Sequence, residues 1–115
     1  MRAVQFFASI PIYLQVMGDM KRDMAAGRVD SVRALAARYG INLNTMQRAC
    51  AELEREGLLV TRRGIGSFVT EDRERLEALR EEMARGLAQA YLEGMAGLGF
   101  GRAEAEARLK REGEE

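Results

Sequence analysis

The sequence contains no histidine and only one cysteine among its 115 residues. Without histidine, the usual zinc ligand sets and the Ser-His-Asp and Cys-His catalytic arrangements are excluded. A single cysteine cannot form a disulfide within the chain. Paired carboxylates remain available, but the acidic residues from Glu71 to Glu82 lie in a helical run of mixed charge, which is typical of a solvated face. We therefore expect no enzyme, no metal and no other cofactor.

The chain also lacks a long apolar run and a net charge. No segment approaches the roughly 18 apolar residues of a membrane span, and the N-terminus lacks a signal-peptide pattern, so we expect a cytoplasmic protein without membrane contact. Residues 1–70 hold ten Lys and Arg against six Asp and Glu, whereas residues 71–115 hold eight against twelve. A basic segment followed by an acidic one suits a nucleic-acid surface joined to a solvated helical region. At 115 residues we expect no large effector-binding domain.

Two short helices are predicted in the middle of the chain. Ser31 is a favourable start and Gly40 a favourable stop for the first helix, which covers residues 31–39. After a turn, the second helix is predicted to begin near Asn44 or Thr45 and to run to Glu56. Two helices joined by such a short turn match the helix-turn-helix pattern, whose second helix enters the major groove of DNA.

The exposed start of the second helix is rich in side chains that can bond phosphate oxygens or base edges. Asn and Gln can pair with adenine and Arg with guanine. These residues are Asn42, Asn44, Thr45, Gln47 and Arg48. The opposite, apolar stripe consists of Met46, Ala49, Cys50 and Leu53. Ion pairing of Arg48 with Glu52 is an alternative to DNA contact, and we interpret Cys50 as a small buried hydrophobe rather than a redox sensor.

A β-hairpin is predicted directly after this helix. The β-prone runs Leu58 to Arg63 and Ser67 to Thr70 enclose the turn Gly64-Ile65-Gly66. A hairpin in this position is the wing of a winged helix, and an arginine near its tip can reach a phosphate or a minor groove.

A supporting helix is predicted from Pro11 to about Ala26, because proline is favourable at a first helical position and Gly27 follows. One side of it is apolar. The residues on that side are Tyr13, Val16, Met17, Met20 and Met24. We expect them to pack behind the two DNA-reading helices, with the methionines as core filler.

Beyond Thr70 a long amphipathic helix is predicted from Glu71 to about Ala96, followed by a glycine-rich break and a shorter helix from Arg102 to about Arg111. The long helix carries an apolar stripe. Its members are Leu76, Leu79, Met83, Leu87, Ala90, Tyr91 and Met95. The two helices can fold back on each other, with little buried area, or pair with the same region of a second subunit, which we favour because an isolated helix is marginal in water. The predicted fold is mainly α with a small β-hairpin: a winged helix-turn-helix domain in residues 1–70, then a C-terminal two-helix dimerisation region in residues 71–115.

Four segments, taken together, resemble the GntR family of bacterial transcription regulators. They are PIYLQV (11–16), SVRALA (31–36), INLNTMQRACAELEREGLL (41–59) and TRRGIGSFV (61–69). The Asn-x-Asn-Thr-x-Gln-Arg start of the second helix and the short C-terminal region are most similar to the small YtrA-like branch. The resemblance implies a homodimer formed by the C-terminal region, and a two-fold protein prefers a pseudo-palindromic site on double-stranded DNA.

The resemblance also implies individual DNA contacts. Arg33, Asn42, Asn44, Thr45, Gln47 and Arg48 are assigned to the major groove or its phosphates, and Arg62, Arg63 and Gly64 to the wing. The dimer contacts are assigned to Leu76, Leu79, Met83, Leu87, Tyr91 and Met95. The sequence departs from the family at Leu43, where some relatives have a polar or basic residue. It departs again between Gly27 and Ser31, where the family has a longer loop. Either the loop is truly shorter in this protein, or residues of the natural chain are absent there, which is the hypothesis that we favour.

The function expected from these patterns is a sequence-specific DNA-binding transcription regulator, a repressor that acts as a homodimer on a pseudo-palindromic operator. Two alternatives remain open. One is a regulator that responds to an unknown small-molecule effector in a pocket between the C-terminal helices. The other is a winged helix that binds a partner protein instead of DNA.

Overall fold

The computed structural model describes residues 10–27 and 40–114. These residues form four helices and one two-stranded antiparallel hairpin, which confirms the prediction of a mainly helical chain with a small hairpin. The chain divides into two compact units between Arg80 and Glu81. The predicted helix at residues 31–39, the candidate Arg33 and the shortened segment after Gly27 lie outside the described residues.

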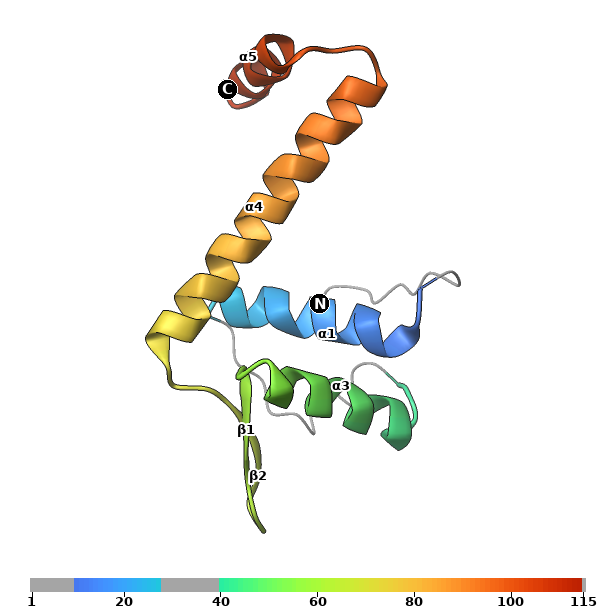
Figure 1. Cartoon of the computed structure of the whole chain (residues 1–115), viewed down its shortest axis with the longest axis vertical. Helices are drawn as coiled ribbons and strands as arrows, with labels where there is room; N and C mark the ends of the chain where they lie inside the picture. Colours follow the sequence, from blue (N-terminus) through green and yellow to red (C-terminus); the bar gives the residue numbers. More distant parts are fainter. Residues whose placement is uncertain (1–9, 28–39, 115) are drawn as a thin grey trace. The chain divides into compact units, whose positions relative to one another are not determined.

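Helix α1 spans Ile12–Ala25 (Figure 1). It begins one residue later than predicted because Pro11 is the N-cap: its carbonyl accepts the N–H groups of Leu14 and Gln15 at 3.1 and 3.3 Å. The apolar side of the helix is confirmed as core. Val16, Met17, Met20 and Met24 are buried, whereas Tyr13 is only partly buried.

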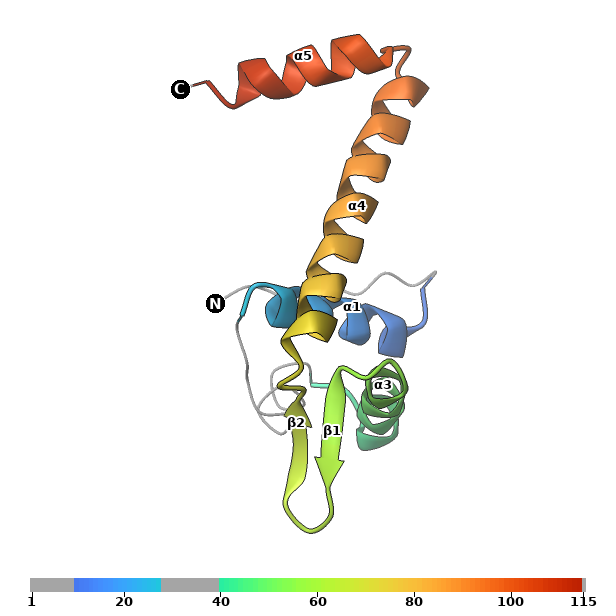
Figure 2. The same cartoon turned by 60° about the vertical axis from the view of Figure 1, so that its left-hand side comes forward.

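Helix α3 spans Leu43–Arg55, so its predicted start at Asn44 or Thr45 was one or two residues late. The reason is the cap: Asn42 Oδ1 accepts the backbone N–H of Thr45 at 2.8 Å, which satisfies a donor that the helix itself leaves free. Helices α1 and α3 pack against each other, and both views show them side by side (Figures 1 and 2). The buried residues of α3 are Met46, Ala49 and Leu53.

The end of α3 fixes where the hairpin starts. Gly57 adopts a positive φ of 77°, and the N–H of Leu58 donates to the carbonyl of Leu53 at 2.9 Å, as in a Schellman motif. Leu53 and Leu58, the two residues joined by this hydrogen bond, are both fully buried. The reversal carries the chain from the helix directly into the wing.

Strands β1 (Leu59–Arg62) and β2 (Gly66–Val69) pair antiparallel, with Leu59 opposite Val69 and Arg62 opposite Gly66. The predicted turn was therefore placed one residue late, because Gly66 already pairs in the ladder and the loop consists of residues 63–65. A hydrogen bond of 2.9 Å from Thr70 N–H to the carbonyl of Leu58 continues the pairing beyond the strands.

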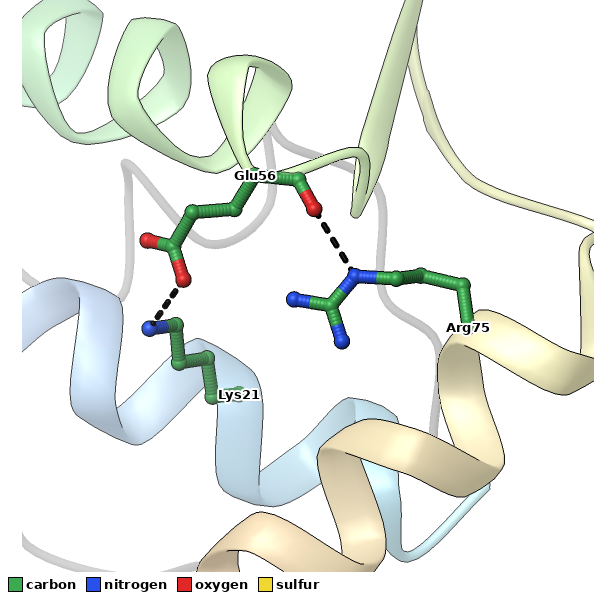
Figure 3. Close-up of polar contacts among 3 residues, drawn as sticks. All are labelled: Lys21, Glu56 and Arg75. Atoms are coloured by element: carbon green, nitrogen blue, oxygen red, sulfur yellow. Dashed lines mark hydrogen bonds and ion pairs between the residues drawn. The ribbon is translucent and has the colours of Figure 1, made fainter.

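Glu56, at the C-terminal cap of α3, joins three segments of the first unit (Figure 3). Its carboxylate accepts from Lys21 Nζ of α1 at 2.7 Å, and its backbone carbonyl accepts from Arg75 Nε at 2.8 Å. Arg75 lies in the first turn of α4 (Arg73–Gly97), which begins two residues later than predicted because Asp72 Oδ1 accepts the N–H groups of Glu74 and Arg75. The start of α4 is thus anchored to the end of α3.

The second unit contains the remainder of α4 and helix α5, which spans Arg102–Glu112. The glycine-rich break between them is confirmed (Figure 2). Helix α5 begins where Glu104 Oε1 accepts the N–H of Gly101 at 3.1 Å. The hydroxyl of Tyr91 donates to the carbonyl of Ala105 at 2.7 Å, and Ala105 is buried. The two helices of the second unit therefore contact each other at Tyr91 and Ala105.

Candidate nucleic-acid interface

The exposed end of α3 presents most of the side chains predicted to read DNA. Asn44, Gln47 and Arg48 are exposed, and Thr45 is partly exposed. The first turn of the helix carries no acidic residue, so no carboxylate within this turn offsets the positive end of the helix dipole. Such an end favours a phosphate, whose oxygens accept free N–H groups.

Asn42 has a role that the sequence did not indicate, because it caps the helix. Its Oδ1 accepts the N–H of Thr45, which uses one of the two lone pairs of this oxygen. The amide NH₂ group keeps its two donors, which suit a phosphate oxygen or a base acceptor. Asn42 therefore shapes the start of the recognition helix in addition to any DNA contact.

Leu43 stands at the same end and is 67% exposed. Sequence reasoning noted only that a polar contact is absent from this position. An exposed leucine at the start of a recognition helix can instead contact the methyl group of thymine.

Arg48 does not pair with Glu52, which was the alternative to DNA contact. The carboxylate of Glu52 accepts from Arg55 at 2.8 Å. The guanidinium of Arg48 lies over the ring of Tyr13, with its Cζ 4.0 Å from the ring centroid, and Nη2 donates to the Tyr13 hydroxyl at 3.3 Å. Sequence reasoning placed Tyr13 in the core and missed this contact, since nothing in the local pattern links two residues that are 35 positions apart.

The wing presents the second group of predicted residues. Arg62 ends β1, and Arg63 and Gly64 lie in the loop, where the φ of 78° at Gly64 favours glycine. Both arginines are exposed, and neither has an acidic partner among the described residues. The guanidinium of Arg62 lies 5.7 Å from the ring centroid of Phe68 on the paired strand. Because β1 also packs against α3, the wing arginines and the start of α3 belong to one unit.

The residues predicted to form a dimer fall into two groups. Leu76 is partly exposed, and Leu79 is 1% exposed and packs within its own chain, so Leu79 is core rather than a free contact surface. In the second unit Leu87 is 74% exposed, and Met83, Tyr91 and Met95 are partly exposed. A groove of about 420 Å³ lies beside them. Its lining residues are Leu87, Ala88, Tyr91, Leu92, Arg102, Glu106 and Leu109.

Cys50 is partly buried on α3. Burial raises the pKa of its thiol, and the negative charge of Glu54, one turn further along, raises the pKa further. A thiol with a raised pKa is protonated at neutral pH and reacts slowly, which agrees with the interpretation of Cys50 as a packing residue.

Within residues 10–27 and 40–114, no cluster of three or more potential ligand side chains could hold a metal ion. Over the same residues, none of the helices is long and apolar enough to cross a membrane.

Comparison with known proteins agrees with this geometry. Residues 13–69 match the family model described as bacterial regulatory proteins, gntR family. The chain is 34% identical over 102 residues to an uncharacterized HTH-type transcriptional regulator, YhcF, of Bacillus subtilis, covering 84% of each protein. It is 31% identical over 100 residues to the HTH-type transcriptional repressor YtrA of the same organism, covering 76% of this chain and 77% of YtrA.

A solved structure of a GntR family transcriptional regulator from Listeria monocytogenes superimposes with a TM-score of 0.81 at 34% identity, covering 92% of this chain and 98% of that one. The predicted winged helix-turn-helix fold is thereby confirmed. These relatives are transcriptional regulators, which also confirms the prediction that the chain is not an enzyme. The protein therefore belongs to the GntR family, resembles its YtrA-like branch, and is a DNA-binding transcription regulator.

Proposed function

We propose that this protein is a sequence-specific repressor that binds a pseudo-palindromic operator as a homodimer in the cytoplasm. The observation that carries the proposal is the exposed polar end of α3, free of acidic residues, in the same unit as two exposed wing arginines. The relative YtrA is named a repressor, which supports this sign of regulation.

Each side chain on α3 would contact the base or phosphate that its hydrogen-bonding groups fit. Arg48 offers a planar fork of donors that matches a guanine edge, and Gln47 and Asn44 can each pair with adenine. Thr45 lies in the first turn, where a hydroxyl and free N–H groups suit a phosphate. The candidate Arg33 would add a further major-groove or phosphate contact.

The wing would supply contacts that do not depend on sequence. Arg62 and Arg63 are exposed cations at the end of β1 and in the loop, where they can reach phosphates or a minor groove. Gly64 lets the loop turn tightly without a side chain between it and the duplex.

The homodimer would be formed through the apolar side chains of the second unit. Leu87 at 74% exposure, together with the partly exposed Met83, Tyr91 and Met95, offers a stripe that a second copy can cover. A two-fold dimer places two copies of α3 about one DNA turn apart, which is why the operator is expected to be pseudo-palindromic.

A fluorescence-anisotropy titration tests the proposal. The purified protein is titrated with duplex DNA from upstream of its own gene and with a scrambled duplex, at salt concentrations from about 50 to 200 mM. We expect tighter binding to the upstream duplex, weakening steeply with salt because each phosphate contact releases a counterion. Absence of binding to both duplexes at low salt would refute the proposal and favour a protein-interaction module.

The groove beside Leu87 favours a second, additional function, which is response to a small-molecule effector. Its lining is mainly apolar, with the ion pair between Arg102 and Glu106 at 3.2 Å as a polar feature. A compound bound there should raise the thermal stability of the wild type and shift its DNA affinity, but should have neither effect on Leu92→Glu. A shift of the same size in both proteins would exclude this groove as the effector site.

A further inference from the structure

We propose that Tyr13 is a positioning residue for Arg48 and thereby sets how sharply the protein discriminates its operator from other DNA. The inference rests on the proposed function, because it assumes that Arg48 reads a base. It adds a residue of the supporting helix to the machinery of sequence recognition.

The first observation is the geometry of the pair. Tyr13 is the second residue of α1, and Arg48 lies on α3, one turn beyond its start. The guanidinium carbon is 4.0 Å from the centroid of the tyrosine ring, which is well within the distance for a cation–π contact. Nη2 of Arg48 also donates to the tyrosine hydroxyl at 3.3 Å, so the arginine is held both by its face and by one of its nitrogens.

The second observation is that the other candidate partner of Arg48 is occupied. Glu52, one turn further along α3, accepts instead from Arg55 at 2.8 Å. Among the described residues, the contacts of the Arg48 guanidinium are with Tyr13, and Arg48 remains exposed to solvent. Within the described part of the chain, an aromatic ring therefore holds the guanidinium, rather than a carboxylate that would have to release it.

This arrangement suits a base-reading arginine. A stacked guanidinium uses its flat face, so the N–H donors along its edge other than the one directed at Tyr13 stay available for a bidentate contact with guanine. A free arginine side chain has many rotamers and loses them on binding, whereas one held on a ring has lost part of that freedom already. Tyr13 is only partly buried, so its ring serves as a platform at the edge of the core.

The experiment measures discrimination rather than overall affinity. A duplex of about 30 base pairs, long enough for two half-sites one turn apart, is first selected by the wild-type protein from a random-sequence pool. The dissociation constants of this duplex are then compared with those of duplexes that carry single G·C to A·T changes. The proteins measured are the wild type, Tyr13→Leu, Tyr13→Phe, Arg48→Ala, and the double variant that combines Tyr13→Leu with Arg48→Ala. Leu14→Ala, at the exposed next position of α1, is the control for a general disturbance of that helix.

Discrimination is the ratio of the dissociation constants of the A·T variant and the selected duplex. We expect Arg48→Ala to lower this ratio about tenfold at one G·C pair, and Tyr13→Leu to lower it about threefold at the same pair. Tyr13→Phe keeps the ring and should retain most of the discrimination, and Leu14→Ala should retain all of it. In the double variant, the loss of Tyr13 should add nothing, because the arginine that it positions is absent.

Unchanged discrimination in Tyr13→Leu, alongside a clear loss in Arg48→Ala, would overturn the inference and leave the proposed function standing. An additive loss in the double variant would overturn it too, since it would show that Tyr13 acts independently of Arg48. If the wild type selects no sequence from the pool, both the inference and the proposed function fail. Should Tyr13→Leu not fold, Tyr13→Trp replaces it: this larger ring should keep or increase discrimination, and a loss would overturn the inference.

Discussion

The side chain of Arg75 donates from Nε to the backbone carbonyl of Glu56 at 2.8 Å and so connects the first turn of α4 to the C-cap residue of the recognition helix α3 (Figure 3). The last carbonyls of a helix have no partner within the helix, and they are the negative end of its dipole, so a guanidinium is a favourable cap. The carboxylate of the same Glu56 binds Lys21 of α1. One residue therefore connects α1, α3 and α4 within the first unit.

Removal of this cap should destabilise the DNA-binding unit. We expect Arg75→Ala to lower the free energy of unfolding by about 1.5 to 3 kcal/mol, the usual range for a hydrogen bond that involves a charged group. Urea denaturation followed by circular dichroism measures the change. Arg73→Ala, an exposed position in the same turn, is the control and should have little effect. Equal losses from the two substitutions would show that the contact with Glu56 contributes nothing specific.

The wing arginine Arg63 should contribute to affinity for all DNA sequences. Arg63→Ala should weaken binding to the operator and to a scrambled duplex by the same factor, and should reduce the slope of log affinity against log salt by about one for each subunit. Anisotropy titrations at several salt concentrations give both quantities. Lys110→Ala removes an exposed cation of α5 and should leave the slope unchanged. A loss confined to the operator would mean that Arg63 reads bases rather than phosphates.

Most of the fold was predictable because it depends on local signals. Gly27 and Gly57 have the positive φ angles expected of helix stops, and most of the apolar stripe of α1 and of α3 is buried as the spacing indicated. For the helices and strands of the described residues, the errors of position were of one or two residues at the boundaries. At each start of α1, α3 and α4, the residue that caps the helix decided the position, and several neighbouring residues were competent to do so.

The candidate interface was less predictable because it depends on contacts between distant residues. The spacing of the apolar residues along α3 was enough to predict its exposed polar end. It was not enough to predict the partner of Arg48: Glu52 is the candidate one turn away in the sequence, whereas the observed partner is Tyr13 on another helix. Leu79 was predicted as a dimer contact, but it is buried within its own chain. An amphipathic stripe indicates that a residue is covered, but it does not indicate whether the same chain or a second subunit covers it.

Leu87 provides a direct test of the proposed dimer. Leu87→Glu places a charge in the middle of the exposed apolar stripe, so it should convert the dimer into a monomer, as measured by sedimentation velocity. Binding to a full operator should then weaken about a hundredfold, because the second half-site no longer benefits from the linked subunit. Gln89→Glu, an equal change of charge at an exposed position on the opposite side of α4, should leave the dimer intact. A monomeric wild type, or a dimer that survives Leu87→Glu, would refute an interface at this stripe.

Cys50 should make the stability of the protein depend on pH in the alkaline range. Burial, and then the charge of Glu54, raises the pKa of the Cys50 thiol, so the folded chain holds this proton more tightly than the unfolded chain does. The stabilising contribution is therefore fully present below the unfolded pKa of about 8.5 and is lost as the pH rises through the folded value. Between about pH 7 and about pH 10, the free energy of unfolding should fall more for the wild type than for Cys50→Ala, which lacks the group. Glu54→Gln removes the second cause alone and should give an intermediate fall. Parallel profiles for wild type and Cys50→Ala would contradict the prediction, as would rapid alkylation of the native thiol at neutral pH.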